Sequence, residues 1–476
     1  MTENLTIIIV LVGYKVLLLG VGFWASQRVK NEADFFIGGG RGLGAWTAGL
    51  SYAASTSSAW VLLGFTGILF SRGLIALWLL PGIFGGYVLT WIVMGPRLND
   101  ETRHRGHVTI VDFMATDASA RMKRMIGLTA AAMILFCFVF YISSQFQAAG
   151  NAFSSVFHME SAEAILLGAT IIVVYCLLGG FWAASITDAI QACIMGIGCI
   201  LVPMVTLASA GGIGNVLSTL SANETAGFFS LTGESVGFVG VGLALGLLGT
   251  GLGALGQPQL LNRIMAVESR SARLRGAAIT IGWGAIIYTG LVWLALSARA
   301  MEIEAGGESL FFVAAGQFLP PVLAGVVIAA VLSAVMSTVD SLLLAAASAI
   351  SRDAGFRWKN PKRALLTGRV AMGAVAVFAV LMTLYLPRDI FSRVLFAWVA
   401  LGAAFGPIIL TRCLGWQVRS EFRLFAMLAG FLTAVAAYYI DGPVAEVVEK
   451  WVAWIVGLAI LRFGRESETG KVQSRS

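Results

Sequence analysis

The sequence predicts an all-α integral membrane protein with about thirteen transmembrane helices. Of its 476 residues, 58% are hydrophobic and 12% are charged, whereas an ordinary soluble domain is roughly 25% charged. The apolar residues form runs of about 20, the length of a membrane-spanning helix. Lysine and arginine lie in every second connection between the runs, except the very short one around Gly180. This alternation is typical of membrane topology.

The thirteen expected spans lie near residues 5–26, 44–70, 74–94, 126–153, 162–179, 186–208, 236–256, 276–298, 320–350, 366–386, 391–411, 422–440 and 443–463. An odd number of spans places the two termini on opposite sides of the membrane. The positive-inside rule puts the amino terminus outside and the tail, residues 464–476, in the cytoplasm, in a plasma (inner) membrane. The net charge of +7 is divided among these connections, which disfavours nucleic acid as a partner.

Two spans carry residues that weaken a helix at its centre. Span 44–70 contains a polar stretch at 49–60, and span 236–256 has glycines at 246, 249, 251, 253 and 256, followed by Pro258. Each glycine disfavours a helix by about 1 kcal/mol relative to alanine. The two spans are five apart, which predicts a five-plus-five inverted repeat with a midplane site between two broken helices.

The whole chain, 1–476, is then one transmembrane transporter domain. We expect the first repeat at 44–208 and the second at 236–411. One extra helix at 5–26 precedes them, and two extra helices at 422–463 follow.

A stripe of hydroxyl residues marks the ninth span. Ala334, Ser337, Thr338 and Ser341 fall on one helical face, because they are spaced at i, i+3, i+4 and i+7. A hard monovalent cation prefers several oxygens at short range. An unwound stretch around Ala54 to Ser57 would add free carbonyls. The alternative is that the hydroxyls bond to their own helix or join two helices.

Two acidic residues accompany these spans. Asp340 lies well inside the hydrocarbon, where burial of its charge is unfavourable by roughly 2.5 to 3.5 kcal/mol, so we expect it to face a partner or water. It is a candidate cation ligand, proton carrier or structural hydrogen-bond acceptor. Asp188 lies near the cytoplasmic start of the sixth span, where a solvated helix cap is the stronger interpretation.

The sequence disfavours an enzyme. It contains no Walker A sequence, no H-E-x-x-H and no G-x-S-x-G. The five cysteines match no zinc pattern and the three histidines lie in connections. We expect no cofactor, and sodium as the only metal ion.

Several stretches together resemble the sodium:solute symporter family, and within it most closely the sodium/proline branch. They are 36–41 (FIGGGR), 178–181 (LGGF) with 187–188 (TD), 256–258 (GQP), 334–341 (AVMSTVDS) and 398–407 (WVALGAAFGP). The likeness runs in matching order over nearly the whole chain. It implies a LeuT-like fold and a symporter that imports a small organic solute with sodium across the bilayer.

The resemblance also implies roles for single residues. Carbonyls of Ala54, Ser57 and Ala334 and hydroxyls of Ser337 and Thr338 would bind sodium. A second cation, which some members are thought to bind, would use Ser337 together with Asp188, Asp340 and Ser341. The solute would lie near a further set: Ser58, Trp60, Tyr141, Thr250, Ala254 and Pro258.

Three positions depart from the sodium/proline branch. Thr56 replaces an aspartate that is important for sodium, and Thr250 and Ala254 replace a tryptophan and a tyrosine proposed to contact proline. Loss of each aromatic removes packing of about 1 to 3 kcal/mol. We therefore expect a different or larger solute, either another amino acid or a small carboxylate.

Alternating access around the midplane site is the expected mechanism. One sodium ion that crosses about 100 mV and a tenfold gradient releases roughly 3.7 kcal/mol, enough to concentrate a neutral solute a few hundred-fold. The alternatives are a proton-coupled carrier, given Thr56, Asp188 and Asp340, and a transporter-like membrane sensor. A channel is disfavoured because the sequence shows no repeated filter.

Overall fold

The computed structural model describes residues 2–27, 36–37, 41–157, 159–178, 180–235, 237–355, 361–386, 389–440 and 442–466. Residues 38–40 and 179, which belong to the motifs above, lie outside these ranges. The predicted cytoplasmic tail also lies outside them from residue 467 onward.

Helices account for the predicted spans of the first half of the chain. An apolar run in lipid must satisfy its backbone internally, and a helix does so. The elements are α1 (Thr2–Ser26); α3 (Ala45–Thr56), η1 (Trp60–Phe65) and α4 (Thr66–Arg72); η2 (Gly73–Trp78), α5 (Leu79–Val88), η3 (Leu89–Met94) and α6 (Gly95–His104); α8 (Ala120–Phe157); α9 (Ser161–Leu178); and α10 (Phe181–Ser209).

The second half follows the same rule. Its elements are α13 (Phe238–Gly249), η4 (Thr250–Gly256) and α14 (Pro258–Ala266); α15 (Arg270–Ala300); α17 (Pro321–Ser348) with η6 (Ala349–Asp353); α18 (Pro361–Tyr385); α19 (Ile390–Cys413); α20 (Ser420–Tyr438); and α21 (Pro443–Val447), η7 (Val448–Val452) and α22 (Ala453–Phe463). Short helices occupy connections: α7 (Ile110–Met114), α11 (Gly212–Asn223), α12 (Ala226–Phe229), η5 (Gly307–Ser309) and α16 (Leu310–Phe318).

By length and composition, ten helices among the described residues could cross a membrane. The shorter apolar helix α9 and the segmented stretches from α3 to α4 and from α21 to α22 cover the remaining predicted spans. The all-helical membrane fold is therefore confirmed, while the number of thirteen spans stays a prediction.

Both spans with breakers are interrupted. Helix α3 ends at Thr56, and Ser57 leaves the helix with φ −94° and ψ 58°. In the other span, α13 gives way to a 3-10 segment, η4, before α14 starts at Pro258. Close packing requires glycine there, because a Cβ on Gly253 would lie 1.9 Å from Cδ1 of Trp398.

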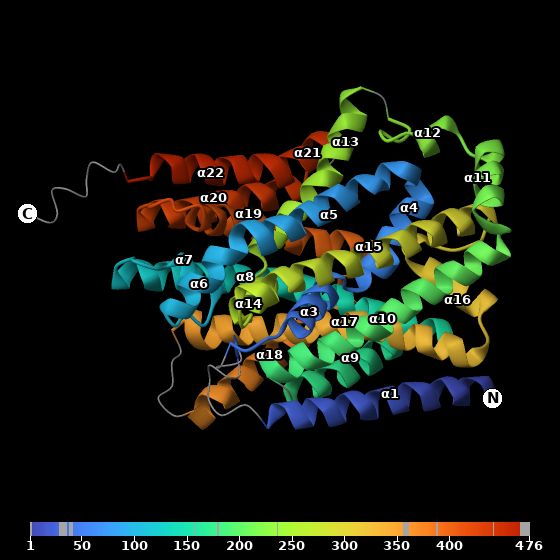
Figure 1. Cartoon of the computed structure of the whole chain (residues 1–476), viewed down its shortest axis with the longest axis horizontal. Coiled ribbons are helices and arrows are strands. Elements are labelled where there is room, and N and C mark those ends of the chain that lie inside the picture. The colour runs from blue at the N-terminus through green and yellow to red at the C-terminus, as the bar shows by residue number, and fades with distance from the viewer. Residues whose placement is uncertain are drawn as a thin grey trace, which may run out of the picture.

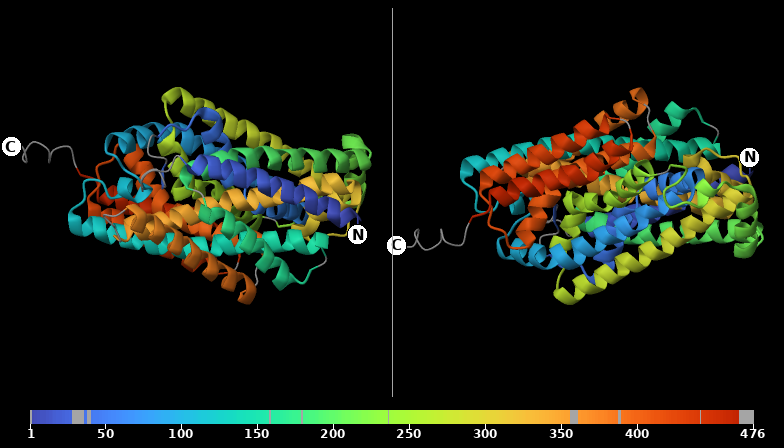
Figure 2. Two further views of the ribbon diagram at one scale, coloured as in Figure 1. Left: turned by 90° about the horizontal axis from the view of Figure 1, so that it is seen from below. Right: turned by 90° about the horizontal axis from the view of Figure 1, so that it is seen from above.

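The helices run roughly along one common direction (Figure 1). Helix α1 begins at one end of the bundle, and α22 finishes at the opposite end, which Figure 2 shows from two further sides. The interior segment α3 packs against α10, α15 and α17, and α19 packs against η4. These contacts bring the two interrupted spans and the hydroxyl stripe into the centre of the protein.

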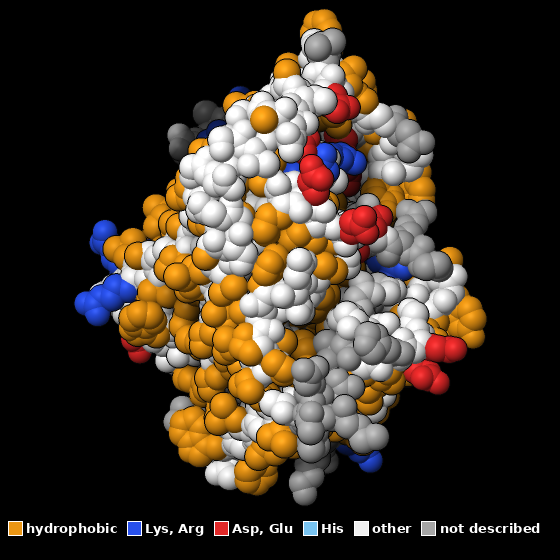
Figure 3. Space-filling model, turned by 90° about the vertical axis from the view of Figure 1, so that its right-hand side faces the viewer, with side chains coloured by type: hydrophobic (Ala, Val, Ile, Leu, Met, Phe, Trp, Pro, Cys, Tyr) orange, Lys and Arg blue, Asp and Glu red, His pale blue; other side chains and the backbone are white. Residues whose placement is uncertain are grey.

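The two ends of the bundle differ. Where α22 finishes, the Asn99 amide on α6 donates to the carbonyls of Ile264 and Val267 at 2.8 and 3.1 Å, tying α6 to α14. The end where α1 begins has a recess of about 720 Å³. Acidic and basic side chains gather on this face (Figure 3), and those that line the recess include Arg72, Glu224, Arg299, Glu446, Glu449 and Lys450.

Candidate functional site

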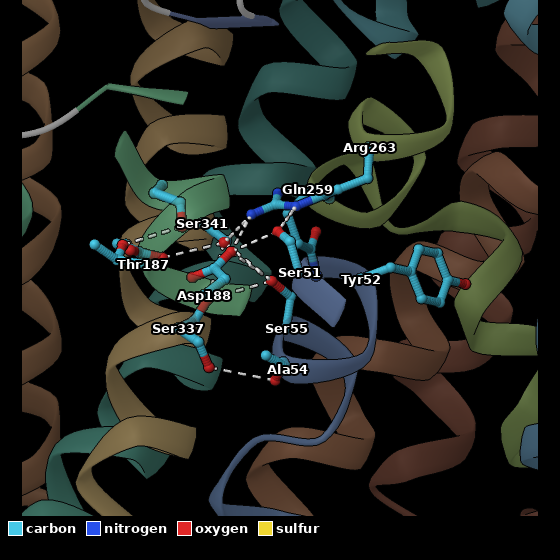
Figure 4. Close-up of polar contacts among 12 residues, drawn as sticks. Ser51, Tyr52, Ala54, Ser55, Thr187, Asp188, Gln259, Arg263, Ser337 and Ser341 are labelled. Carbon is cyan, nitrogen blue, oxygen red and sulfur yellow. Dashed lines mark hydrogen bonds and ion pairs between the residues drawn. The ribbon is translucent and has the colours of Figure 1, made fainter. Parts of the chain in front are cut away.

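The residues predicted to bind sodium come from the end of α3 and the middle of α17, and these segments touch (Figure 4). The Ser337 hydroxyl donates to the Ala54 carbonyl at 3.3 Å. The hydroxyls of Ser337 and Thr338 also donate to the Ala334 carbonyl, at 3.2 and 3.0 Å. The four residues are at most 1% exposed. Their role as sodium ligands stays a prediction.

The helix break lies later than predicted. Helix α3 is continuous through Ala54 and Ser55, and only Ser57 and Ser58 leave it. The Ser57 amide still bonds to the Ala53 carbonyl at 2.9 Å. Ala54 therefore lies in the last turn, where carbonyls have no partner further along the helix. The Ala54 oxygen thus comes from a helix end, where it accepts from the Ser337 hydroxyl, rather than from an unwound stretch.

The expectation of a solvated Asp188 was wrong. Asp188 is 0% exposed and lies two turns inside α10, because that helix starts at Phe181. Its Oδ2 accepts hydrogen bonds from Ser51 at 2.7 Å and Ser55 at 3.5 Å. It also forms an ion pair of 2.8 Å with Nη2 of Arg263. A buried carboxylate needs such partners, and this arginine was not among the predicted site residues.

Arg263 lies on α14, and its side chain is 2% exposed. Its Nε donates to Ser51 at 3.0 Å and Nη1 to the Gln259 carbonyl at 2.6 Å. Nη2 also contacts the Ser341 hydroxyl. In the sequence Arg263 is followed by Arg270, Arg273 and Arg275, which is typical of a basic connection between spans. One sequence feature could have indicated that Arg263 is buried. It lies only five residues after Pro258, where the interrupted span resumes as a helix.

Asp340 is the second buried carboxylate of this region, 3% exposed. Its Oδ1 accepts from Ser341 Oγ at 3.1 Å, and its Oδ2 has no hydrogen-bond partner among the described residues. Asp340 lines a cavity of about 260 Å³ between α1, α9, α10, α17 and α18. Asp188, Asp340 and Ser341, the predicted second cation residues, are thus close together, but with Arg263 among them.

The predicted solute residues divide into two groups. In the first, the Tyr141 hydroxyl donates to Ser58 Oγ at 3.3 Å, beside the break after α3. The indole of Trp60 donates to the Thr56 carbonyl at 3.4 Å and packs against Phe391, with ring centroids 6.0 Å apart. Gln145, which was not predicted, lies one turn from Tyr141, and its Oε1 accepts from the Ala59 amide at 3.2 Å.

The second group lies on the other interrupted span. Thr250 joins the first group through Trp398, whose indole donates to the Thr250 carbonyl at 3.0 Å and lies 6.4 Å from the Tyr141 ring. Ala254 packs near Gly86 on α5 instead, and buried Pro258 begins α14. Trp398 thus supplies an aromatic ring beside Thr250, where the sequence had indicated the loss of one.

The profile of the sodium:solute symporter family matches residues 35–430. The chain belongs to this family. It is 31% identical to the high-affinity proline transporter PutP of Bacillus subtilis over 88% of this chain and 89% of that protein. It is 29% identical to the sodium/proline symporter of Escherichia coli over 96% of this chain and 92% of that protein.

Solved structures share the fold. A sodium-coupled sialic acid symporter in a substrate-bound outward-open state superposes with a TM-score of 0.81, at 17% identity, over 97% of this chain and 98% of that chain. MhsT in complex with L-phenylalanine gives 0.56, at 16% identity, over 87% and 97%. These are transporters of the LeuT-like fold, which confirms that predicted fold for the chain, while the bounds of the two repeats stay a prediction.

Membership in the family decides several predictions. The protein is a multi-pass membrane symporter that couples sodium to the import of an organic solute, and it is a transporter rather than an enzyme. Sodium coupling is favoured over proton coupling, and transport over a sensor role. Sodium is the co-transported ion, and no cofactor is indicated for this family.

Proposed function

We propose that the symporter imports an amino acid or a small carboxylate with a sodium ion bound by Ala54, Ser57, Ala334, Ser337 and Thr338. The contact of 3.3 Å between the Ser337 hydroxyl and the Ala54 carbonyl carries this proposal. It brings the Ala54 carbonyl, in the last turn of α3, against the buried hydroxyl stripe of α17. Neutral oxygens at short range are what a hard cation prefers.

Sodium at this point would hold the end of α3 against α17. The same interrupted segment continues into Ser58, which belongs to the proposed solute pocket with Tyr141 and Trp398. Sodium therefore orders the wall that the solute contacts. The coupling is reciprocal, so bound solute raises sodium affinity by the same factor.

The recess at the α1 end supports an outward-facing state. Phe391 both lines the recess and packs against Trp60 of the proposed pocket. The opposite end is tied by the contacts of α6 with α14. Alternating access would open that end after the recess closes. This arrangement fits an amino terminus outside the cell and a carboxy terminus in the cytoplasm, in the plasma membrane.

The solute class rests on the pocket and on the relatives. Both relatives are named as proline transporters, and hydroxyls of Ser58 and Tyr141 with the amide of Gln145 offer hydrogen bonds to a carboxylate. Thr250 and Ala254 are smaller than the aromatic residues of the sodium/proline branch, but Trp398 lies beside Thr250, so the pocket differs in shape from that branch. Proline is therefore one test solute among amino acids and small carboxylates.

The test is thermal unfolding of the purified protein with a panel of amino acids and carboxylates, in sodium and in choline buffers. We expect stabilisation by a solute only in sodium, weakened in Ser337→Ala and Thr338→Ala. Ser348→Ala is the matched control, since Ser348 lies on the same helix and bonds to the Ala345 carbonyl at 2.9 Å. Equal stabilisation in choline, unchanged by the first two substitutions, would contradict the proposed site.

A further inference from the structure

The cavity of about 260 Å³ between α1, α9, α10, α17 and α18 opens at the side of the bundle. Helix α1 ends, and α18 begins, toward the end of the bundle where α22 finishes (Figure 1). Two lining side chains on α1, Leu19 and Phe23, are 40% and 70% exposed. Arg369 on α18 lines the cavity and is exposed as well. These three residues form the mouth of the cavity.

Arg369 is a charged residue on a helix surface that is otherwise apolar. Its neighbours Leu366 and Val370 are 61% and 63% exposed, as expected for side chains that contact lipid. Arg369 lies about 12 Å along α18 from Pro361, where the helix begins. Its guanidinium has no hydrogen bond, ion pair or aromatic contact among the described residues. A guanidinium has five N–H donors, so this one needs an anion or water from outside the chain.

The walls behind the mouth are mainly apolar. Small residues keep the space open, and larger apolar side chains surround it: Gly22, Ala183 and Ala184, with Leu19, Phe23 and Leu344. Only the inner end is different, because Asp340 Oδ2 has no hydrogen-bond partner among the described residues and a buried carboxylate favours water there. The mouth therefore combines a cation with an adjoining apolar space.

We propose that this mouth binds one anionic phospholipid, with its phosphate on Arg369 and the first part of an acyl chain between α1 and α18. A phosphate accepts two parallel hydrogen bonds from a guanidinium. Basic pockets between transmembrane helices bind anionic headgroups in this way. The lipid would join α1, the predicted extra helix, to α18 of the predicted second repeat. The site is separate from the proposed sodium and solute sites, because it shares no residue with them.

The charge at the mouth is tested by native mass spectrometry of the purified full-length protein. The protein is titrated with phosphatidylglycerol or with phosphatidylcholine of the same acyl chains. We expect the wild type to bind one phosphatidylglycerol about tenfold more tightly than phosphatidylcholine, and Arg369→Gln to lose this preference. Arg124→Gln is the matched control, since Arg124 is exposed near the start of α8 and does not line the cavity.

The apolar part of the site is tested by filling it. A Cβ on Gly22 would have Tyr175 Cε2 as its nearest neighbour, at 3.9 Å, so a side chain enters the cavity without moving the backbone. We expect Gly22→Leu to weaken phosphatidylglycerol binding although Arg369 is still present. Gly20→Leu is the matched control on the same helix, because a Cβ on Gly20 meets nothing within 4 Å and Gly20 does not line the cavity.

The results that would overturn the proposal are distinct. An arginine that only extends into water would give the wild type no preference between the two lipids. A preference fully retained in Arg369→Gln would show that another group binds the phosphate. Equal weakening in Gly22→Leu and Gly20→Leu would place the lipid on the open surface of α1 instead of in the cavity. Sodium binding should be unchanged in all four variants, which separates this site from the proposed function.

Discussion

Two clusters of buried oxygens lie one helical turn apart on the same two helices, and they differ in charge. The first joins Ala54 on α3 to Ser337 on α17, and the second joins Ser55 on α3 to Ser341 on α17 and Ser51 on α3 to Asp188 on α10. The first cluster consists of hydroxyls and carbonyls alone. The second includes Asp188 and Arg263, which form an ion pair.

The difference is one of charge balance between two neighbouring parts of the same interior. Neutral oxygens attract sodium without a strong countercharge, so the ion can leave. In the second cluster two carboxylates, Asp188 and Asp340, lie with one guanidinium, and Asp188 Oδ1 and Asp340 Oδ2 have no hydrogen-bond partner among the described residues. Neighbouring turns of the same helices thus carry clusters of different charge.

The largest expected effect comes from breaking the charged cluster. Asp188→Ala leaves Arg263 buried without its carboxylate, and the loss should be about 3 to 5 kcal/mol of unfolding free energy. Unfolding of the purified protein followed by intrinsic fluorescence measures it. Asp188→Asn with Arg263→Gln should recover most of the loss. If the unfolding free energy of Asp188→Ala in the same assay were within about 1 kcal/mol of that of the wild type, the ion pair would contribute little to stability.

Substitutions in the neutral cluster should lower the affinity for sodium more than they lower the free energy of unfolding. Ser337→Ala removes one hydroxyl from the proposed sodium site, and we expect sodium affinity to fall about tenfold, equivalent to about 1.4 kcal/mol. Stability without sodium should change by less than about 1 kcal/mol. Radioactive sodium binding and sodium-free unfolding measure the two effects. A loss of stability without a loss of affinity would assign Ser337 a structural role.

Ser341→Ala tests the boundary between the clusters. Ser341 contacts Arg263 and Ser55, but Arg263 keeps Asp188 and Ser51 as partners in the variant. We expect a loss of stability of about 1 kcal/mol and unchanged affinity for sodium. Unfolding and ion binding on one preparation check both. A fall in sodium affinity as large as that of Ser337→Ala would mean that the two clusters act as one site.

An effect confined to solute binding is expected away from both clusters. Tyr141→Phe removes the hydroxyl that donates to Ser58 and keeps the ring beside Trp398. Sodium affinity in the absence of solute should stay within about twofold, while solute-dependent stabilisation falls by about 0.5 to 1.5 kcal/mol. Thermal unfolding with solutes measures it. An equal effect without solute would exclude Tyr141 from the pocket.

The sequence by itself determined the features that depend on neighbouring residues. Apolar runs, breakers near Gly253 and Pro258, and the hydroxyl spacing from Ala334 to Ser341 are local, so periodicity alone predicted the helices, the interruptions and the stripe. Helix α3 ends later than predicted, because packing against α17 decides where between Ala54 and Ser57 the helix stops.

Only the tertiary structure decided the charged cluster. Asp188 and Arg263 are 75 residues apart, and each alone resembles an ordinary charged residue near the membrane surface. Burial becomes favourable only when folding supplies the opposite charge and hydroxyls at hydrogen-bond distance. The sequence around either residue does not show that the two side chains come together. For the same reason, Gln145 and Trp398 are recognised as neighbours of the pocket only in the tertiary structure.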